Sequence, residues 1–258
     1  MKIYHEELAD VDRYLRSSAH LKLEDKRGQY LGYLRPIKKY AKIDASTKML
    51  EVGTGTGWFP TLCKMEGLQC RGLEISPQLI EYARKTAAEY GIDPDIHLGN
   101  LEDSDIGDSV YDVIVCSNVF EHVEYWRTGV AKIYRALKPG GVMFFESTNK
   151  FSFVSGEYPD FPLYGWLPNR IRYNLRTAVH GPDIMKLGID FHQFTHGMLR
   201  KEFEKAGFSR IFDRVEIAQE DAVSNSLRRF AVRWSRKSSL IKALALTFAE
   251  ATRFICVK

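Results

Sequence analysis

The sequence predicts an α/β fold with a doubly wound, mostly parallel sheet of seven strands. Three observations predict it. Apolar strand-like segments alternate with helix-like segments from residue 48 to residue 148. A glycine-rich turn, GTGTG at 53–57, separates the first strand from the first helix of this series. The segment VYDVIVCSN at 110–118 is continuously apolar at its centre, as expected of a strand covered on both faces of a sheet.

Local signals set the boundaries of these elements. Pro77 opens a helix that ends near Gly91, and Thr195 is placed to cap a later helix. The Pro-Gly-Gly stretch at 139–141 is expected to end the helix that starts at Trp126. Strands are predicted over 48–53, 69–75, 95–100, 110–118, 142–148, 209–218 and 252–258. Helices are predicted over 28–41, 58–67, 77–91, 126–141 and 195–208, and within 224–250.

The chain is predicted to be a single domain, 1–258, with three additions. Residues 1–45 are expected to form an N-terminal helical cover. Between 150 and 194, four prolines and many aromatic residues interrupt the strand–helix alternation, which is typical of a substrate lid. Residues 219–250 are expected to form a basic helical insertion before the last strand.

Composition and charge are those of an ordinary soluble protein. Hydrophobic residues make up 45% of the chain, and the net charge of +4 is too small to imply nucleic acid by itself. The four cysteines have no metal-ligand spacing, which favours reduced thiols. The N-terminal stretch is charged and amphipathic rather than a signal peptide, so the expected location is cytoplasmic.

The glycine-rich turn excludes two common nucleotide sites. A dinucleotide-binding turn has the pattern GxGxxG, but position 58 holds tryptophan where the third glycine belongs. A P-loop needs GxxxxGK[ST], and that string does not occur in the chain. Acidic residues flank the turn instead, with Glu51 just before it and Glu74 at the end of the next strand. A carboxylate there could accept two hydrogen bonds from a ribose diol.

The pattern ExGxGxG followed by Glu74 resembles the class I S-adenosylmethionine (SAM)-dependent methyltransferases of the small-molecule type. CSNVFEHV at 116–123, LKPGG at 137–141 and the late helix ending FEKAGF extend the resemblance to residues 25–218 and the closing strand. It implies S-adenosyl-L-methionine as cofactor and S-adenosyl-L-homocysteine as product. It also implies that Asn100, where the family usually has aspartate, lies beside the adenine. The implied cofactor residues are Tyr30, Glu51, Gly53, Thr54, Gly55, Gly57, Glu74, Ile75, Asn100, Leu101, Ser117 and Asn118.

His122 is the first candidate for a catalytic base, because it follows the fourth strand at the edge where ligands bind in such sheets. Glu121 could orient its ring, or the pair could simply brace the loop. The pair also resembles the corresponding segment of ubiquinone-biosynthesis-type O-methyltransferases. Some of these use a metal with an acid at the position of Asn118, so no metal is expected here. His192 is a second base candidate, whereas His196 is expected to be solvated.

The lid segment is rich in aromatic residues and arginines. Aromatic rings suit an apolar acceptor and arginines suit a carboxylate or phosphate, although the rings could equally pack the lid onto the sheet. Candidate substrate residues are Tyr158, Trp166, Arg172 and His180. The sequence therefore favours a small-molecule or lipid-like acceptor.

The segment 228–242 carries six basic residues and no acid, with apolar residues at helical spacing. Such a helix could lie on an anionic membrane surface, or it could pack on the domain and leave its charges in water.

Three functions remain open from the sequence. The first is methyl transfer to an oxygen of a small or amphiphilic acceptor that is aromatic, lipid-linked or glycan-linked. The second is transfer to nitrogen or carbon, and the third is a noncatalytic module that binds SAM or a partner. A nucleic-acid substrate is not expected, because the chain has no NPPY-type motif and its basic residues cluster on one helix. The acceptor and the oligomeric state are left unassigned.

Overall fold

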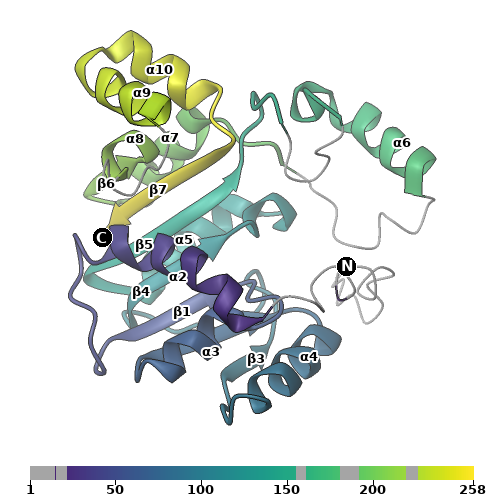
Figure 1. Cartoon of the computed structure of the whole chain (residues 1–258), viewed down its shortest axis with the longest axis vertical. Coiled ribbons are helices and arrows are strands. Elements are labelled where there is room, and N and C mark those ends of the chain that lie inside the picture. Colours follow the sequence, from purple (N-terminus) through teal and green to yellow (C-terminus); the bar gives the residue numbers. More distant parts are fainter. Residues whose placement is uncertain (1–14, 16–21, 155–160, 181–191, 219–225) are drawn as a thin grey trace.

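The computed structural model describes residue 15 and residues 22–154, 161–180, 192–218 and 226–258. Within these, seven strands form one sheet in the order β3-β2-β1-β4-β5-β7-β6 (Figure 1). β1 to β5 run parallel to one another, and β7 lies between β5 and β6 and is antiparallel to both. The strands are β1 Lys48–Val52, β2 Gln69–Glu74, β3 Asp95–Leu98, β4 Tyr111–Ser117, β5 Leu137–Thr148, β6 Arg210–Asp213 and β7 Ala251–Val257. The predicted fold class is confirmed.

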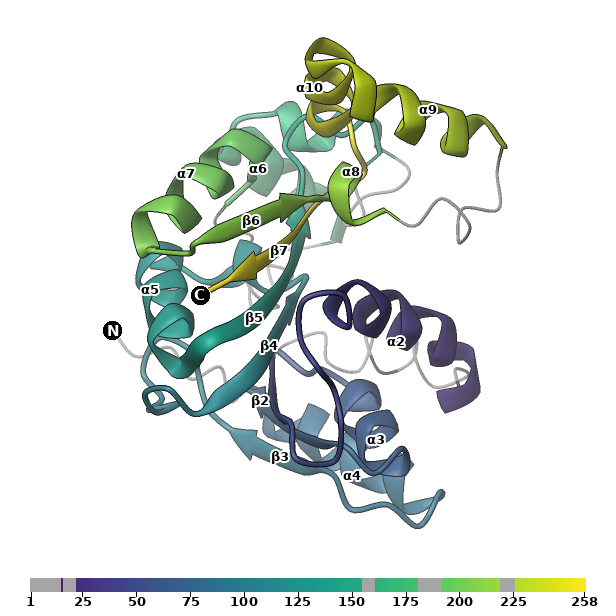
Figure 2. The same ribbon diagram turned by 90° about the vertical axis from the view of Figure 1, so that its left-hand side faces the viewer.

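The helices lie in two layers around the sheet. Figure 2 shows α2, α3 and α4 on one side of the sheet and α5 and α7 on the other. The main helices are α2 Leu23–Ile37, α3 Trp58–Met65, α4 Pro77–Ala88, α5 Trp126–Ala136, α6 Asn169–His180 and α7 His196–Ala206. The shorter or later ones are η1 Phe120–His122, η2 Tyr164–Trp166, α8 Arg214–Ile217, α9 Ser226–Lys237 and α10 Ser239–Thr247. None of the helices described is long and apolar enough to cross a membrane.

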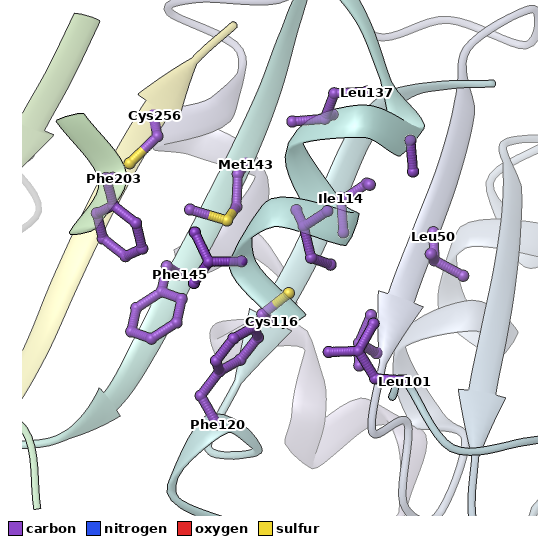
Figure 3. Close-up of a cluster of buried hydrophobic side chains, with 14 of the residues drawn as sticks. Leu50, Leu101, Ile114, Cys116, Phe120, Leu137, Met143, Phe145, Phe203 and Cys256 are labelled. Carbon is purple, nitrogen blue, oxygen red and sulfur yellow. The ribbon is translucent and has the colours of Figure 1, made fainter. Parts of the chain in front are cut away.

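Two hydrophobic cores explain why the central strands are apolar throughout. Successive side chains of a strand point to opposite faces, so each face of the sheet needs its own apolar set. The core on the α5–α7 side contains Ile114, Cys116, Met143, Phe145, Phe203 and Cys256 (Figure 3). The core on the α2–α3 side contains Val113, Val115, Val142, Phe144, Ile255 and Val257. The sheet is therefore a middle layer with both faces buried. The carboxyl ends of its parallel strands are the place where such sheets bind ligands.

Several predicted boundaries are confirmed by the local hydrogen bonds. The Thr195 hydroxyl accepts from the backbone N–H of Met198 at 3.3 Å, which caps α7 as expected. Ser76 caps α4 in the same way, with Pro77 in the first turn of the helix. Gly207, with φ of +107°, ends α7 in the left-handed region that glycine adopts readily.

Two predicted boundaries are wrong. The helix predicted over 126–141 ends at Ala136, and β5 already begins at Leu137. Pro139 disfavours a helical conformation of the residue before it. Backbone hydrogen bonds with Lys258, next to β7, hold this segment in the sheet. The Gly140 N–H donates to the Lys258 carbonyl at 3.1 Å, and the Lys258 N–H donates to the Gly141 carbonyl at 3.0 Å.

The strand predicted over 209–218 ends at Asp213, and residues 214–217 form the short helix α8 instead. The Asp213 carboxylate accepts from the N–H groups of Val215 and Glu216 at 2.9 and 3.1 Å. The Glu216 carboxylate in turn accepts from the Asp213 N–H at 2.8 Å. This reciprocal capping box satisfies the first turn of a helix and overrides the alternating pattern of the sequence.

The glycine-rich turn lets α3 leave β1 in close contact with its neighbours. Gly53, Gly55 and Gly57 have φ of +68°, +54° and +70°. A Cβ on Gly57 would lie 2.5 Å from the Cβ of Ala83 on α4 and 2.8 Å from the Cδ1 of Ile96 on β3. The turn thus requires glycine both for its backbone conformation and for the packing of two elements against it.

We expect Gly57→Ala to lower the free energy of unfolding by about 3 kcal/mol, because left-handed backbone strain and overpacking add. Gly67→Ala is the matched control, since Gly67 has φ of +73° but nothing within 4 Å of an added Cβ. It should cost only the backbone strain, about 1–2 kcal/mol. Urea denaturation of both variants measures the difference, and equal losses would contradict the packing argument.

Candidate cofactor and active site

The predicted site residues gather at the carboxyl edge of the sheet. β1, β2, β4 and β5 are parallel, so the segments that follow them emerge at the same edge. The edge carries the glycine turn after β1, Glu74 at the end of β2, and Ser117 to His122 after β4. The structure therefore brings together groups that are up to seventy residues apart in the sequence.

Glu74 joins the two loops that follow β1 and β2. One of its carboxylate oxygens accepts from the Gly55 N–H at 2.7 Å. The other accepts from the N–H groups of Ile75 and Ser76 at 2.9 and 3.1 Å. The side chain is buried, and this burial raises the pKa of its carboxyl although the three N–H groups act in the opposite direction.

Glu51 is a second buried acid at the same edge, where its carboxylate accepts from the Thr54 hydroxyl. Burial raises the pKa of Glu51 to about 8, with a smaller increase from the negative charge of Glu74. Two buried carboxyls lie beside the positive-φ glycines of the turn, and added positive charge there would stabilise their ionised forms. The two carboxyls therefore fit a ligand that carries positive charge and hydroxyl groups.

The N-terminal helix contributes Tyr33 to this edge and not Tyr30. The Tyr33 hydroxyl is 2.8 Å from the Ser117 Oγ and accepts from the Gln29 Nε2 at 2.7 Å. Burial raises the pKa of Tyr33 to about 12. Tyr30 is fully buried against Phe59, and its hydroxyl donates to Glu66 at 2.9 Å.

Glu66 lies at the far end of α3 from the glycine turn, so the hydroxyl of Tyr30 is directed away from that turn. A cofactor role of Tyr30 stays a prediction. The two tyrosines are neighbours on one helix face, so sequence spacing alone could not separate their roles.

The other predicted cofactor residues lie around the same edge. Asn118 is exposed with a left-handed φ of +52°, and its N–H donates to the Glu146 carbonyl at 2.9 Å. The Asn100 Oδ1 accepts from the Glu102 N–H at 2.9 Å, so this side chain shapes its own loop. Leu101 is buried in the core, whereas Ile75 is 36% exposed. Direct contact of these residues with adenine stays a prediction.

The loop after β4 holds two of the predicted catalytic residues, Glu121 and His122, and the third, His192, contacts this loop. His122 is exposed at the end of η1. The buried Glu121 carboxylate accepts from the Ser147 hydroxyl of β5 at 2.6 Å. The His192 N–H lies 3.3 Å from the Glu121 carbonyl, and its Nε2 is 2.9 Å from the Glu124 carbonyl. The Glu121 contact supports the bracing interpretation, and His192 meets the loop from the lid side.

The lid residues predicted to bind substrate pack mainly on protein. The Trp166 Nε1 donates to the Ser152 carbonyl at 3.1 Å, and its ring stacks on Phe248 at 6.3 Å. Arg172 is fully buried and donates to the Asn169 Oδ1 at 2.7 Å. These contacts support the packing interpretation for Trp166, and its role at the substrate stays a prediction. Tyr158 and the side chain of His180 lie outside the described residues.

Two features of this region were not predicted from the sequence. His196 was expected to be solvated, but its ring stacks on Phe254 at 4.7 Å and burial lowers its pKa. It lines a cavity of about 520 Å³ between α7 and α10. The second feature is an ion pair of Arg253 on β7 with Glu146 at the end of β5. An acid inside the apolar run FFEST was the available signal for Glu146. No group of three metal-binding side chains is found among the described residues.

Comparisons with known proteins agree with this geometry. Residues 50–145 match the family described as Methyltransferase domain. The chain is 25% identical over 170 residues to a ubiquinone biosynthesis O-methyltransferase of Rickettsia conorii, covering 64% of this chain and 58% of that enzyme. The match thus spans little more than half the length of this curated relative.

Solved structures show the same fold. A SAM-dependent methyltransferase of Thermotoga maritima, described as a possible histamine N-methyltransferase, has a TM-score of 0.56 at 17% identity and 99% coverage of both chains. A phosphoethanolamine N-methyltransferase 2 of Haemonchus contortus, solved with S-adenosyl-L-methionine, has a TM-score of 0.56 at 17% identity, covering 89% of this chain and 52% of that one.

The matched segment is a methyltransferase domain, and the fold is that of the class I SAM-dependent methyltransferase superfamily. Within it, the chain has local similarity to the ubiquinone-biosynthesis O-methyltransferases. S-adenosyl-L-methionine is the cofactor of this superfamily, and the residues at the glycine turn fit it. The two buried acids suit the positive charges of the cofactor, and contact of Glu74 with the ribose hydroxyls stays a prediction.

The raised pKa of Glu51 predicts the pH dependence of stability without cofactor. Between the ordinary value of 4.5 and about 8, the folded chain holds a proton that the unfolded chain has lost. The free energy of unfolding should therefore fall as pH rises through this window, by at most about 1.4 kcal/mol per pH unit.

Glu51→Gln should flatten this fall, because its neutral amide can still accept from Thr54. Urea denaturation at pH 5, 6, 7 and 8 measures the slope, with Glu81→Gln on the exposed face of α4 as the control. The assignment is wrong if the slope of Glu51→Gln equals that of the unsubstituted protein.

Proposed function

We propose that this protein transfers the methyl group of SAM to an oxygen atom of a small or amphiphilic acceptor. The observation that carries the proposal is the buried pair Glu51 and Glu74 at the glycine turn, at the edge where α/β folds bind ligands. Bound SAM supplies a methyl group on a sulfonium that is open to attack by a nucleophile. The task of the chain is to hold both partners in line, and much of the rate can come from that positioning.

The choice of oxygen rests on the similarity to the O-methyltransferases and on His122. A phenolic hydroxyl with a pKa near 10 is mostly neutral at pH 7 and needs a base when it attacks. The exposed His122 ring lies at the carboxyl edge on a loop that Glu121 fixes to β5 through Ser147. In this proposal His122 takes the proton of the acceptor hydroxyl while Glu121 positions the loop.

Nitrogen is the second candidate nucleophile, and one observation favours it. Glu121 directs its carboxylate to Ser147, which fits a pair that braces the loop. A neutral amine attacks without prior removal of a proton, so an inert His122 would point to a nitrogen acceptor.

A lipid-like acceptor would be met at a membrane surface, so the proposal includes peripheral contact through residues 228–242.

Binding of S-adenosyl-L-homocysteine tests the cofactor site directly. We expect calorimetry to detect binding, and Glu74→Gln to weaken it by about 10- to 100-fold through the loss of charge-assisted hydrogen bonds. Asp103→Asn, an exposed change near the same edge, is the control and should bind normally. No detectable binding by the unsubstituted chain at high micromolar ligand would overturn the proposal.

The role of His122 is tested by turnover with labelled SAM, using the host metabolite extract as a source of acceptors. His122→Ala should lower kcat by about 10²–10⁴-fold and leave the affinity for S-adenosyl-L-homocysteine unchanged. His97→Ala is the matched control, because His97 is exposed on β3 and pairs with Asp95. Normal turnover of His122→Ala removes it from the mechanism, and identification of the labelled product then shows which atom was methylated.

A further inference from the structure

We propose that α9 and α10 form a docking surface for an anionic lipid bilayer. The surface consists of exposed apolar residues on both helices, flanked by exposed basic residues on α9. The inference extends the proposed function by naming the membrane chemistry and the inserting side chains. Vesicle binding needs neither cofactor nor acceptor, so the two proposals can fail separately.

The apolar part of the surface consists of two pairs of side chains, each spaced i, i+4 on one helix. Phe230 and Trp234 on α9 are 60% and 49% exposed, and their rings are 5.6 Å apart. Leu240 and Leu244 on α10 are 70% and 51% exposed. Such pairs stand on one helix face one turn apart. A soluble protein has little reason to hold two large apolar pairs in water, and clusters of this kind mark interaction sites.

The basic residues divide into anchors and outward-facing charges. Arg236 donates to the carbonyls of Val215 and Ala218 at 3.2 and 2.6 Å, which fixes α9 against α8. Lys242 fixes α10 in the same way, at 2.6 Å from Asp213 and 3.0 Å from Glu216.

Three further cations lie on α9 away from these anchors. Arg229, Arg233 and Lys237 are exposed. Between residues 222 and 249 the sequence contains no acidic residue. The helix pair therefore combines exposed apolar side chains with exposed basic residues on α9.

This combination favours a bilayer over the other anionic partners. Nucleic acids offer phosphates and stacking faces, but Leu240 and Leu244 would find no counterpart there. A bilayer interface accommodates aliphatic side chains, aromatic rings and cations at graded depths. Tryptophan and phenylalanine insert at the interface while arginine and lysine remain at anionic headgroups.

The surface continues toward the edge of the sheet where an acceptor would enter. Phe248 at the end of α10 stacks on Phe153 at 5.1 Å and on Trp166 at 6.3 Å, which joins α10 to the start of the lid segment. The Asn149 side chain, just after β5, donates to the carbonyls of Leu246, Thr247 and Ala249 at 3.1, 3.0 and 2.8 Å. Figure 1 shows α9 and α10 together beyond the end of β5. A bilayer on this surface would lie next to the carboxyl edge.

Co-sedimentation with lipid vesicles tests the charged part of the surface. The full chain should bind vesicles containing about one-third phosphatidylglycerol and bind phosphatidylcholine vesicles much more weakly. Arg229→Glu/Arg233→Glu/Lys237→Glu should lower the partition coefficient by about 100-fold or more. Lys38→Glu/Lys39→Glu/Lys85→Glu is the matched control, because it changes the net charge equally at exposed sites elsewhere. An equal loss of vesicle binding in both variants would show unspecific charge attraction and would overturn the proposed docking surface.

The apolar part is tested on the same vesicles. Leu240→Ser/Leu244→Ser should lower vesicle binding by at least about tenfold, because two aliphatic side chains that insert into the bilayer interface are lost. Met65→Ser/Leu98→Ser is the control, because these side chains are 39% and 55% exposed on other elements.

Circular dichroism and binding of S-adenosyl-L-homocysteine verify that each variant is folded. The proposal is overturned if the unsubstituted chain does not sediment with anionic vesicles, or if the leucine pair changes nothing. Binding of the same surface to an acidic protein without vesicle binding would assign it to another partner.

Discussion

The carboxylate of Glu74 accepts hydrogen bonds from the backbone of two loops, and the geometry of the cofactor edge depends on this arrangement. Its contact with Gly55 fixes the glycine turn after β1, while its contacts with Ile75 and Ser76 fix the start of the loop after β2. The parallel pairing of β1 and β2 brings these loops to one edge, and the positive φ values of the turn let its N–H point at the acid. A buried carboxylate without such donors would be costly. The three backbone N–H groups therefore stabilise the buried carboxylate and hold the two loops together.

The acidity of this edge connects the cofactor to the stability of the fold. Glu51 and Glu74 are both buried, and burial raises the pKa of each. A cationic ligand stabilises the charged forms that burial disfavours, so cofactor binding and ionisation of the edge favour one another. The loop after β4 is held by different means, through Ser147 and Glu121 and through the contact of Tyr33 with Ser117. The glycine turn and the loop after β4 are thus held by two separate groups of contacts at the same edge.

Much of this could be predicted from the sequence where the signal is local. The glycine turn, the Thr195 cap and the apolar run of β4 each follow from a few neighbouring residues, and the structure confirms them. Some contacts depend on groups distant in sequence. Tyr30 and Tyr33 look alike in sequence, but Tyr33 contacts Ser117 of β4 whereas Tyr30 contacts Glu66. The errors arise where such a distant group decides the local structure. His196 looks exposed until Phe254 of the last strand packs on it. The strand predicted through 218 is ended by the capping box of Asp213 and Glu216, whose signal competes with apolar alternation.

In the helical insertion, tertiary contacts determine which face of the amphipathic helices is packed on the protein. The sequence left two interpretations of the basic helix, because charge and helical spacing alone do not say which face is packed. In the structure Arg236 and Lys242 bind carbonyls and carboxylates of the body, so these two cations hold the helix pair in place. The anchored face includes Ser235 and Leu246, which are buried. Phe230, Leu240 and Leu244 lie on the opposite side, where they are 60%, 70% and 51% exposed. The anchoring contacts thus create the exposed apolar surface, and a bilayer is the partner that matches both its apolar side chains and its charge.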